Sequence, residues 1–358
     1  MPYFTFTDAS DETFVIRLDD PDEVAHARAL LAGTETDEAR IGGVIVKSPA
    51  EYNIGWSYQL DPDSIFFFDM STEVGDSTMR YVENHLPEVG GHLLPGRVWT
   101  GWSSTLTGEL NLVEGGPGAN RLTGGGGDDL VLGRGGNDVI FGLGGHDHLS
   151  GGDGNDLVFG GEGGDKIGGG AGADILYGGL GGDVMVGDGG SDLLYGDAGN
   201  DKLYGNDGVD TLLGGSGNDR LWGGANTDVL EGGAGADRLN GGAGNDILVG
   251  GSGTDRFYFN TPLSSTGNVD AIGDFASADD SIFLNRATFS GILGNGALNA
   301  SAFHVGTAAA DASDRIIYDP ETGSIFYDAD GKGGAAQVLF AVVAEDTVLT
   351  SADFIAFI

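Results

Sequence analysis

The chain has 358 residues, of which 69 are Gly, 55 are acidic and 16 are Lys or Arg, so its formal net charge is −39. This charge excludes nucleic-acid binding through a basic surface. The absence of Cys excludes disulfide frameworks, thiolate zinc sites and cysteine nucleophiles. No apolar stretch of about 18 residues offers a membrane span, and the opening MPYFTFTDASDET lacks a basic and apolar secretory leader, so we expect a soluble chain.

Residues 1–114 are predicted to form an α+β domain. FTFTD (4–8) and FVIRLDD (14–20) alternate as a hairpin, and Asp20, Pro21 and Glu23 are typical of the start of a helix that runs through Leu31. We expect further strands at 41–47, 55–60, 65–68 and 98–102, and a second helix at 77–86. The segment YNIGWSYQLDP resembles a small domain of secreted proteins, and this resemblance implies no function.

Residues 115–258 are built on a period of nine and contain 49 of the 69 Gly residues. Sixteen units follow one another without a slip, as in GGAGADILY (169–177) and GGAGNDILV (241–249). The first unit has Asn120 at position six, and every later unit has Asp there: Asp129, Asp138, Asp147, Asp156, Asp165, Asp174, Asp183, Asp192, Asp201, Asp210, Asp219, Asp228, Asp237, Asp246 and Asp255. Position eight is apolar in every unit. A flexible Gly-rich linker has no reason to keep these two positions in phase.

Each unit predicts a tight glycine turn followed by a very short strand. Two units close one turn of a coil, and each strand pairs with its equivalent 18 residues later. The turns then form two columns that present a carboxylate about every 4.8 Å, and such carboxylates repel unless a cation lies between them. Asp and turn carbonyl oxygens, six to eight around an ion, suit calcium better than magnesium or a soft metal.

The pattern G-G-x-G-x-D-x-U-x resembles the RTX (repeats-in-toxin) family. This resemblance implies a mainly β fold, a right-handed parallel β-roll of two sheets, with calcium held between successive loops by the position-six Asp side chains and carbonyls. Counting gaps between adjacent loops predicts up to about 13 Ca²⁺ ions. Four residues depart from the glycine pattern and are expected to weaken nearby sites: Arg134, Leu143 and Asn206 at position two, and Asn226 at position four.

Positions seven and nine are predicted to point outward from the roll. In odd-numbered units they form what we call the apolar face: Val139 and Phe141, Leu157 and Phe159, Ile175 and Tyr177, Leu193 and Tyr195, Thr211 and Leu213, Ile247 and Val249. In even-numbered units they form the polar face: His148 and Ser150, Lys166 and Gly168, Lys202 and Tyr204, Arg220 and Trp222, Arg238 and Asn240, Arg256 and Tyr258. We expect the N-terminal domain or a second copy to cover the apolar face. The alternative is an aromatic ladder left open to water.

Residues 259–358 resemble the C-terminal region of serralysin-type RTX proteins. The matching residues are Ile272, Asp274, Phe275, Asp280, Ile282 and Leu284, with Tyr318, Asp319, Tyr327 and Asp328 in hairpins. The resemblance implies a β-rich cap on the roll and an uncleaved C-terminal signal for a type I secretion apparatus, hence a secreted, extracellular protein.

Catalysis is not expected. Neither the H-E-x-x-H motif of serralysins nor the G-x-S-x-G elbow of RTX lipases occurs, and no two His residues are spaced as a zinc pair on a helix. The sequence therefore predicts a calcium-binding RTX protein whose repeat block folds after export and supports the N-terminal domain. Two alternatives remain open: a lectin-like adhesion or ligand-binding protein acting through residues 1–114, and an enzyme with an unrecognised site there.

Overall fold

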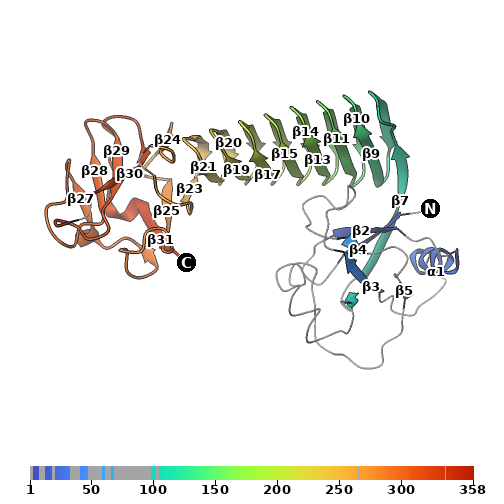
Figure 1. Ribbon diagram of the computed structural model, residues 1–358, viewed down its shortest axis with the longest axis horizontal. Helices are drawn as coiled ribbons and strands as arrows, with labels where there is room; N and C mark the ends of the chain where they lie inside the picture. The colour runs from blue at the N-terminus through green and yellow to red at the C-terminus, as the bar shows by residue number, and fades with distance from the viewer. Residues whose placement is uncertain are drawn as a thin grey trace.

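The computed structural model describes residues 3–7, 13–17, 21–32, 41–46, 59–60, 66–67, 98–101, 105–264, 266–334 and 336–358. Figure 1 shows a long roll of short strands with an N-terminal sheet at one end and a β-rich cap at the other. Within the described residues, the strands of the roll belong to two sheets of 14 and 13 strands. The predicted mainly β fold, a roll of two parallel sheets, is confirmed.

The 16 units give 16 strands that alternate between the two sheets. The apolar-face sheet contains β8 (Arg121–Gly125), β10 (Val139–Gly144), β12 (Leu157–Glu162), β14 (Ile175–Leu180), β16 (Leu193–Ala198), β18 (Thr211–Ser216), β20 (Val229–Gly235) and β22 (Ile247–Gly253). The polar-face sheet contains β9 (Asp129–Gly135), β11 (His148–Asp153), β13 (Lys166–Ala171), β15 (Val184–Gly189), β17 (Lys202–Asp207), β19 (Arg220–Ala225), β21 (Arg238–Ala243) and β23 (Arg256–Phe259). Neighbouring strands are parallel and pair residues 18 apart, for example Val139 with Leu157.

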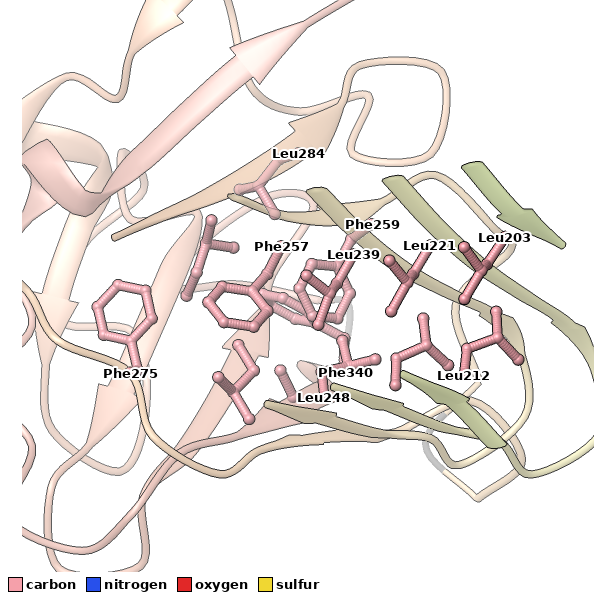
Figure 2. Packing of buried hydrophobic residues seen from close by; sticks show 14 of the residues in the cluster. Leu203, Leu212, Leu221, Leu239, Leu248, Phe257, Phe259, Phe275, Leu284 and Phe340 are labelled. Atoms are coloured by element: carbon pink, nitrogen blue, oxygen red, sulfur yellow. The ribbon is translucent and has the colours of Figure 1, made fainter. Parts of the chain in front are cut away.

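The core of the roll is a single ladder of position-eight side chains that lie between the two sheets. All of them are buried, from Leu122 to Phe257. Figure 2 shows leucines from opposite sheets facing one another, such as Leu203 and Leu212, and the ladder continuing into the aromatic side chains of the cap. Fully burying one such side chain contributes about 1.5–3 kcal/mol, so a unit is stable only within the stack.

The N-terminal elements join the roll through β7 (Thr105–Glu114). This strand pairs antiparallel with β1 (Tyr3–Thr7) and parallel with β9, so the N-terminal hairpin of β1 and β2 (Thr13–Arg17) extends the polar-face sheet. The predicted hairpin and the helix α1 (Pro21–Leu31) are confirmed, and Arg28 of α1 pairs with Glu109 of β7 at 2.5 Å. The remaining described strands are β3 (Ile41–Val46), β4 (Gln59–Leu60), β5 (Phe66–Phe67) and β6 (Val98–Gly101). The predicted helix at 77–86 lies outside the described residues.

The cap continues both sheets of the roll beyond the last repeat. The apolar-face sheet runs from β22 through β24 (Asp270–Ile272), β30 (Val338–Val342), β29 (Ser324–Tyr327), β28 (Ile316–Asp319) and β27 (Phe303–Val305). The polar-face sheet runs from β23 through β25 (Ser281–Asn285), β31 (Phe354–Phe357) and β26 (Gly296–Ala297). Phe289 packs edge-on against Tyr327 and Phe340 at 5.2 and 5.1 Å between ring centroids. The aromatic cluster closes the end of the leucine ladder.

The apolar face differs from its expectation. The described N-terminal strands extend the other sheet, and the outward side chains of the apolar face remain partly exposed, up to 45% for Ile247. Their rings shield one another instead: Phe141, Phe159, Tyr177 and Tyr195 stack with centroids 4.6–5.0 Å apart and nearly parallel planes. No described N-terminal strand therefore covers this face, and its covering by a second copy stays a prediction.

Candidate metal sites

The aspartates at position six lie inside the turns and are almost completely buried. From Asp129 to Asp255, none of the 15 residues is more than 3% exposed. One carboxylate oxygen, Oδ1, has a fixed partner, because it accepts a hydrogen bond from the backbone N–H of the position-six residue one turn earlier. These N···O distances are 2.6–2.9 Å throughout the roll, from the pair Asn120 and Asp138 to the pair Asp237 and Asp255. The predicted register of the Asp columns is thus built into the hydrogen bonding.

The second carboxylate oxygen, Oδ2, has no such partner in 14 of these aspartates. Asp129 is the exception, because its Oδ2 accepts a bond from the N–H of Gly125. A buried polar atom without a partner costs about 1–3 kcal/mol, and more when it carries charge. The oxygens that lack a hydrogen-bond partner within the described residues belong to Asp138, Asp147, Asp156, Asp165, Asp174, Asp183, Asp192, Asp201, Asp210, Asp219, Asp228, Asp237, Asp246 and Asp255.

Main-chain carbonyl oxygens lie close to these carboxylates. A Cβ added to Gly160, at position one, would lie 2.4 Å from Oδ2 of Asp165 and 2.5 Å from the carbonyl oxygen of Gly178. The position-four carbonyls point along the roll, since a Cβ at Gly199 would lie 1.4 Å from the oxygen of Gly181. Within the described residues, position-four carbonyls such as that of Gly181 accept no backbone hydrogen bond. The turns therefore offer free oxygens of two kinds, carboxylate and carbonyl.

This oxygen set fits calcium. Ca²⁺ takes six to eight oxygen ligands in flexible geometry and accepts backbone carbonyls as readily as carboxylates. In the part of the chain that the structure describes, no group of three or more His, Asp or Glu side chains is arranged around one point. An ion between two turns would thus take its carboxylates from adjacent position-six residues and its remaining ligands from carbonyls. Nitrogen-preferring metals find no His cluster among the described residues.

Burial makes the aspartates poor acids when no cation is bound. Desolvation raises the pKa of Asp147, Asp165, Asp192, Asp201, Asp228 and Asp237 to about 7, and the pKa of Asp174 and Asp183 to about 6. For Asp165 the carboxylates of Asp183 and Asp147 add to this rise in pKa, and the backbone hydrogen bond opposes it. The folded roll without cations therefore favours protonated side chains, which is the electrostatic strain that a cation would relieve.

The residues that break the glycine pattern adopt the backbone conformation that glycine would supply. Arg134, Leu143 and Asn206 have φ of 78°, 84° and 73°, and Asn226 at position four has φ of 80°. This left-handed conformation costs a non-glycine residue roughly 1–2 kcal/mol. The weakening of metal sites near these residues stays a prediction.

Two aspartates at position two had not been singled out in the sequence. Asp188 and Asp197 also have positive φ, of 69° and 67°. Asp188 raises the pKa of Asp174 and Asp192 by charge repulsion, and Asp197 does the same for Asp201. Extra carboxylates thus stand beside both columns near the middle of the roll. The signal in the sequence was the replacement of glycine by Asp rather than by a neutral residue.

Position five also has a role that the repeat pattern does not show. The side-chain oxygen of Asn155 accepts a hydrogen bond from the N–H of Ala173 one turn later, at 3.0 Å. His146 does the same with Nδ1, which accepts from the N–H of Gly164 at 2.8 Å. The repeat pattern accepts any residue at this position, yet its side chains bond successive loops together.

Comparisons with known proteins agree with the repeat register. The family model of the RTX calcium-binding nonapeptide repeat matches residues 114–149, 132–167, 150–185, 186–221 and 222–257. A second family model, described as an N-terminal domain, matches residues 1–113. The central block of this chain therefore consists of RTX calcium-binding repeats folded as a β-roll. No curated protein matches the chain.

Two solved structures are similar in part. The solution structure of the AlgE6R3 subunit of the Azotobacter vinelandii mannuronan C5-epimerase is 26% identical and covers 52% of this chain and 80% of its own, with a TM-score of 0.20. The crystal structure of the extracellular lipase LipA from Serratia marcescens is 16% identical and covers 68% of this chain and 40% of its own, with a TM-score of 0.16. TM-scores this low carry no argument about function. Among the described helices, none has the length and apolar character of a membrane span.

Proposed function

We propose that this is a secreted calcium-binding protein whose repeat block folds when Ca²⁺ binds outside the cell, and that the folded roll supports the N-terminal domain. One observation carries the proposal: 14 buried Asp oxygens that point between turns lack a hydrogen-bond partner within the described residues. A folded chain that leaves so many charged oxygens unsatisfied is unstable, and Ca²⁺ is the cation whose ligand preferences match the surrounding carbonyls.

The magnitude of the calcium effect is large enough to decide folding. Extracellular modules bind Ca²⁺ with dissociation constants of about 10⁻⁴–10⁻³ M, so at about 1 mM calcium each ion contributes about 0.4–1.4 kcal/mol through binding to the folded state alone. Up to about 13 ions would then contribute about 5–18 kcal/mol, which is the range of a whole domain's stability. Because each turn contacts only its neighbours, the ions act together along the roll.

Export follows from the same physics. In a cytosol poor in calcium, the Asp columns repel and the thin leucine ladder cannot hold the turns together, so the block remains open enough to be threaded through a type I secretion apparatus. Residues 259–358 would then serve as the C-terminal cap and secretion-signal region, following residues 1–114 and the repeat block 115–258. The continuous strand β7, which pairs with both β1 and β9, supports the role of the roll as a rigid mount for the N-terminal domain.

Circular dichroism of the full chain tests the proposal. We expect a far-UV spectrum dominated by disorder in a chelator and a β-rich spectrum at millimolar Ca²⁺, with magnesium at the same concentration as the control. A spectrum that keeps its β signal in chelator at about pH 8, above the raised Asp pKa values, would contradict calcium-driven folding.

A further inference from the structure

The Asp columns do not end at the last repeat. The backbone N–H of Asp246 donates to Oδ1 of Asp270 at 3.2 Å, and the N–H of Asp255 donates to Oδ1 of Asp280 at 2.9 Å. These two bonds have the geometry of the position-six ladder within the roll, although the steps are 24 and 25 residues instead of 18. Asp270 and Asp280 are both at least nine-tenths buried. Both residues belong to the cap, beyond the last residue matched by the repeat model.

The strands after these aspartates continue the roll in the same way. The N–H of Ala271 donates to the carbonyl of Asp246 at 2.7 Å, and the N–H of Ser281 donates to that of Asp255 at 2.9 Å. Inside the roll the equivalent bond, from Arg256 to Asp237, is 2.9 Å long. The next side chains, Ile272 and Ile282, are buried and extend the position-eight ladder. The segments D-A-I and D-S-I are therefore structural equivalents of D-x-U in a seventeenth and an eighteenth unit.

The oxygens at these two gaps are unsatisfied as they are between repeats. Oδ2 of Asp246 and Oδ2 of Asp255 are buried without a hydrogen-bond partner among the described residues. The carboxyl groups of Asp246 and Asp270 also face each other at hydrogen-bonding range. Two ionised carboxylates have no proton to share, so this contact needs either a proton or a cation between them.

One further contact shows where the polar-face column stops. Oδ2 of Asp280 accepts a hydrogen bond from the N–H of Ala276 at 2.8 Å. Asp129, the first aspartate of the same column, has its Oδ2 bonded in the same way by Gly125. Both ends of this column are thus closed by a backbone N–H four residues earlier, whereas the interior aspartates have none among the described residues. Asp274, whose oxygens accept bonds from the N–H groups of two glycines at 2.9 and 2.7 Å, adds negative charge beside Asp255.

We propose that the cap forms two further Ca²⁺ sites, one between Asp246 and Asp270 and one between Asp255 and Asp280. Calcium would be held by these carboxylates together with main-chain carbonyls of the facing loops and water. The sites rest on the proposed calcium binding of the repeat block, and they extend it to loops that do not carry the nonapeptide pattern. Their effect is to fasten the cap to the last turn of the roll with the same cation that stacks the turns.

Native mass spectrometry of the full chain at millimolar Ca²⁺ tests the two sites by counting bound ions. Asp270→Asn and Asp280→Asn keep an oxygen for the backbone N–H but remove the carboxylate, so each is expected to lower the count by one and the double variant by two. Asp279→Asn is the matched control, since this exposed neighbour of Asp280 lies off the column, and it should bind as many ions as wild type. Counts equal to wild type in both variants would overturn the proposal and favour a shared proton between Asp246 and Asp270. A wild type that binds no calcium would instead refute the proposed function.

A second measurement does not depend on the variants folding. Crystals of the wild-type chain soaked in terbium, which occupies calcium sites and scatters anomalously, should show a peak between Asp246 and Asp270 and another between Asp255 and Asp280. Peaks confined to the gaps between repeats would exclude the two cap sites while leaving calcium binding by the roll intact.

Discussion

Replacing Asp192 by Asn should change the stability of the roll in opposite directions with and without calcium. The amide oxygen of Asn can still accept the hydrogen bond that Asp192 takes from the N–H of Asp174 at 2.9 Å. The substitution removes the partnerless Oδ2 and its charge. Asp192 borders two gaps of its column, one toward Asp174 and one toward Asp210, so both ions lose a carboxylate ligand.

The two effects have different sizes. At about 1 mM calcium, two ions contribute about 1–3 kcal/mol to the folded state, and Asp192→Asn should lose most of this. In chelator the same substitution removes a buried carboxylate whose pKa desolvation has raised to about 7. The chelated variant is therefore expected to be more structured than chelated wild type at about pH 8, where the wild-type carboxylate is ionised.

Urea unfolding followed by circular dichroism, in calcium and in chelator, measures both effects. Asp207→Asn is the control, because Asp207 is exposed at position three of a loop and its removal changes the net charge equally. A loss of stability in both conditions, or an equal response of the control, would refute the assignment of Asp192 as a calcium ligand.

Three further predictions concern the turns, the core and pH. Gly199→Ala should abolish calcium-induced folding of the surrounding turns, because its φ is 159° and the new Cβ would lie 1.4 Å from a carbonyl oxygen, whereas Gly189→Ala meets nothing within 4 Å and should leave the calcium midpoint unchanged. Leu212→Ala should destabilise the calcium-loaded roll by about 2–5 kcal/mol in urea unfolding, while Leu180→Ala, 57% exposed, should change it by less than about 0.5 kcal/mol. The position-six pKa values of about 6 to 7, against 3.8 for a free Asp, mean that the folded chain binds more protons than the unfolded chain between about pH 4 and 7. The calcium-free protein should therefore gain β structure in circular dichroism as pH falls from about 8 to about 5, and a loss of β structure over this range would contradict the sign of the shift.

The repeat block could be predicted from sequence because its period is strict. Every ninth residue from Asp129 to Asp255 is Asp, and the structure places all of them in two columns with the expected 18-residue pairing. The period carries the fold directly, since a coil of two units per turn must put equivalent positions on top of one another.

The cap ligands escaped the same reasoning because insertions interrupt the period. Six and seven extra residues separate Asp270 and Asp280 from the positions that a step of 18 would give, so counting by nine does not find them. The signal was the recurrence of D-x-I in VDAI and DDSI, which was assigned to a family resemblance of the cap and not to the Asp columns.

The strand β7 and the apolar face depended on contacts that the sequence does not encode locally. Thr105–Glu114 was not expected as a strand, and its pairing with both β1 and β9 joins segments about 100 residues apart. The expected covering of the apolar face assumed that exposed rings need a partner element. Phe159 and Tyr177 instead stack on each other at 5.0 Å, because parallel in-register strands place like residues side by side.

The crystal structure of the protein grown at millimolar calcium tests the central claim most directly. At the gap between Asp165 and Asp183, near the middle of one column, we predict density for a Ca²⁺ ion at about 2.3–2.6 Å from oxygens of both carboxylates and of turn carbonyls. A well-ordered roll in which this gap and its neighbours hold only water or direct hydrogen bonds would contradict the account.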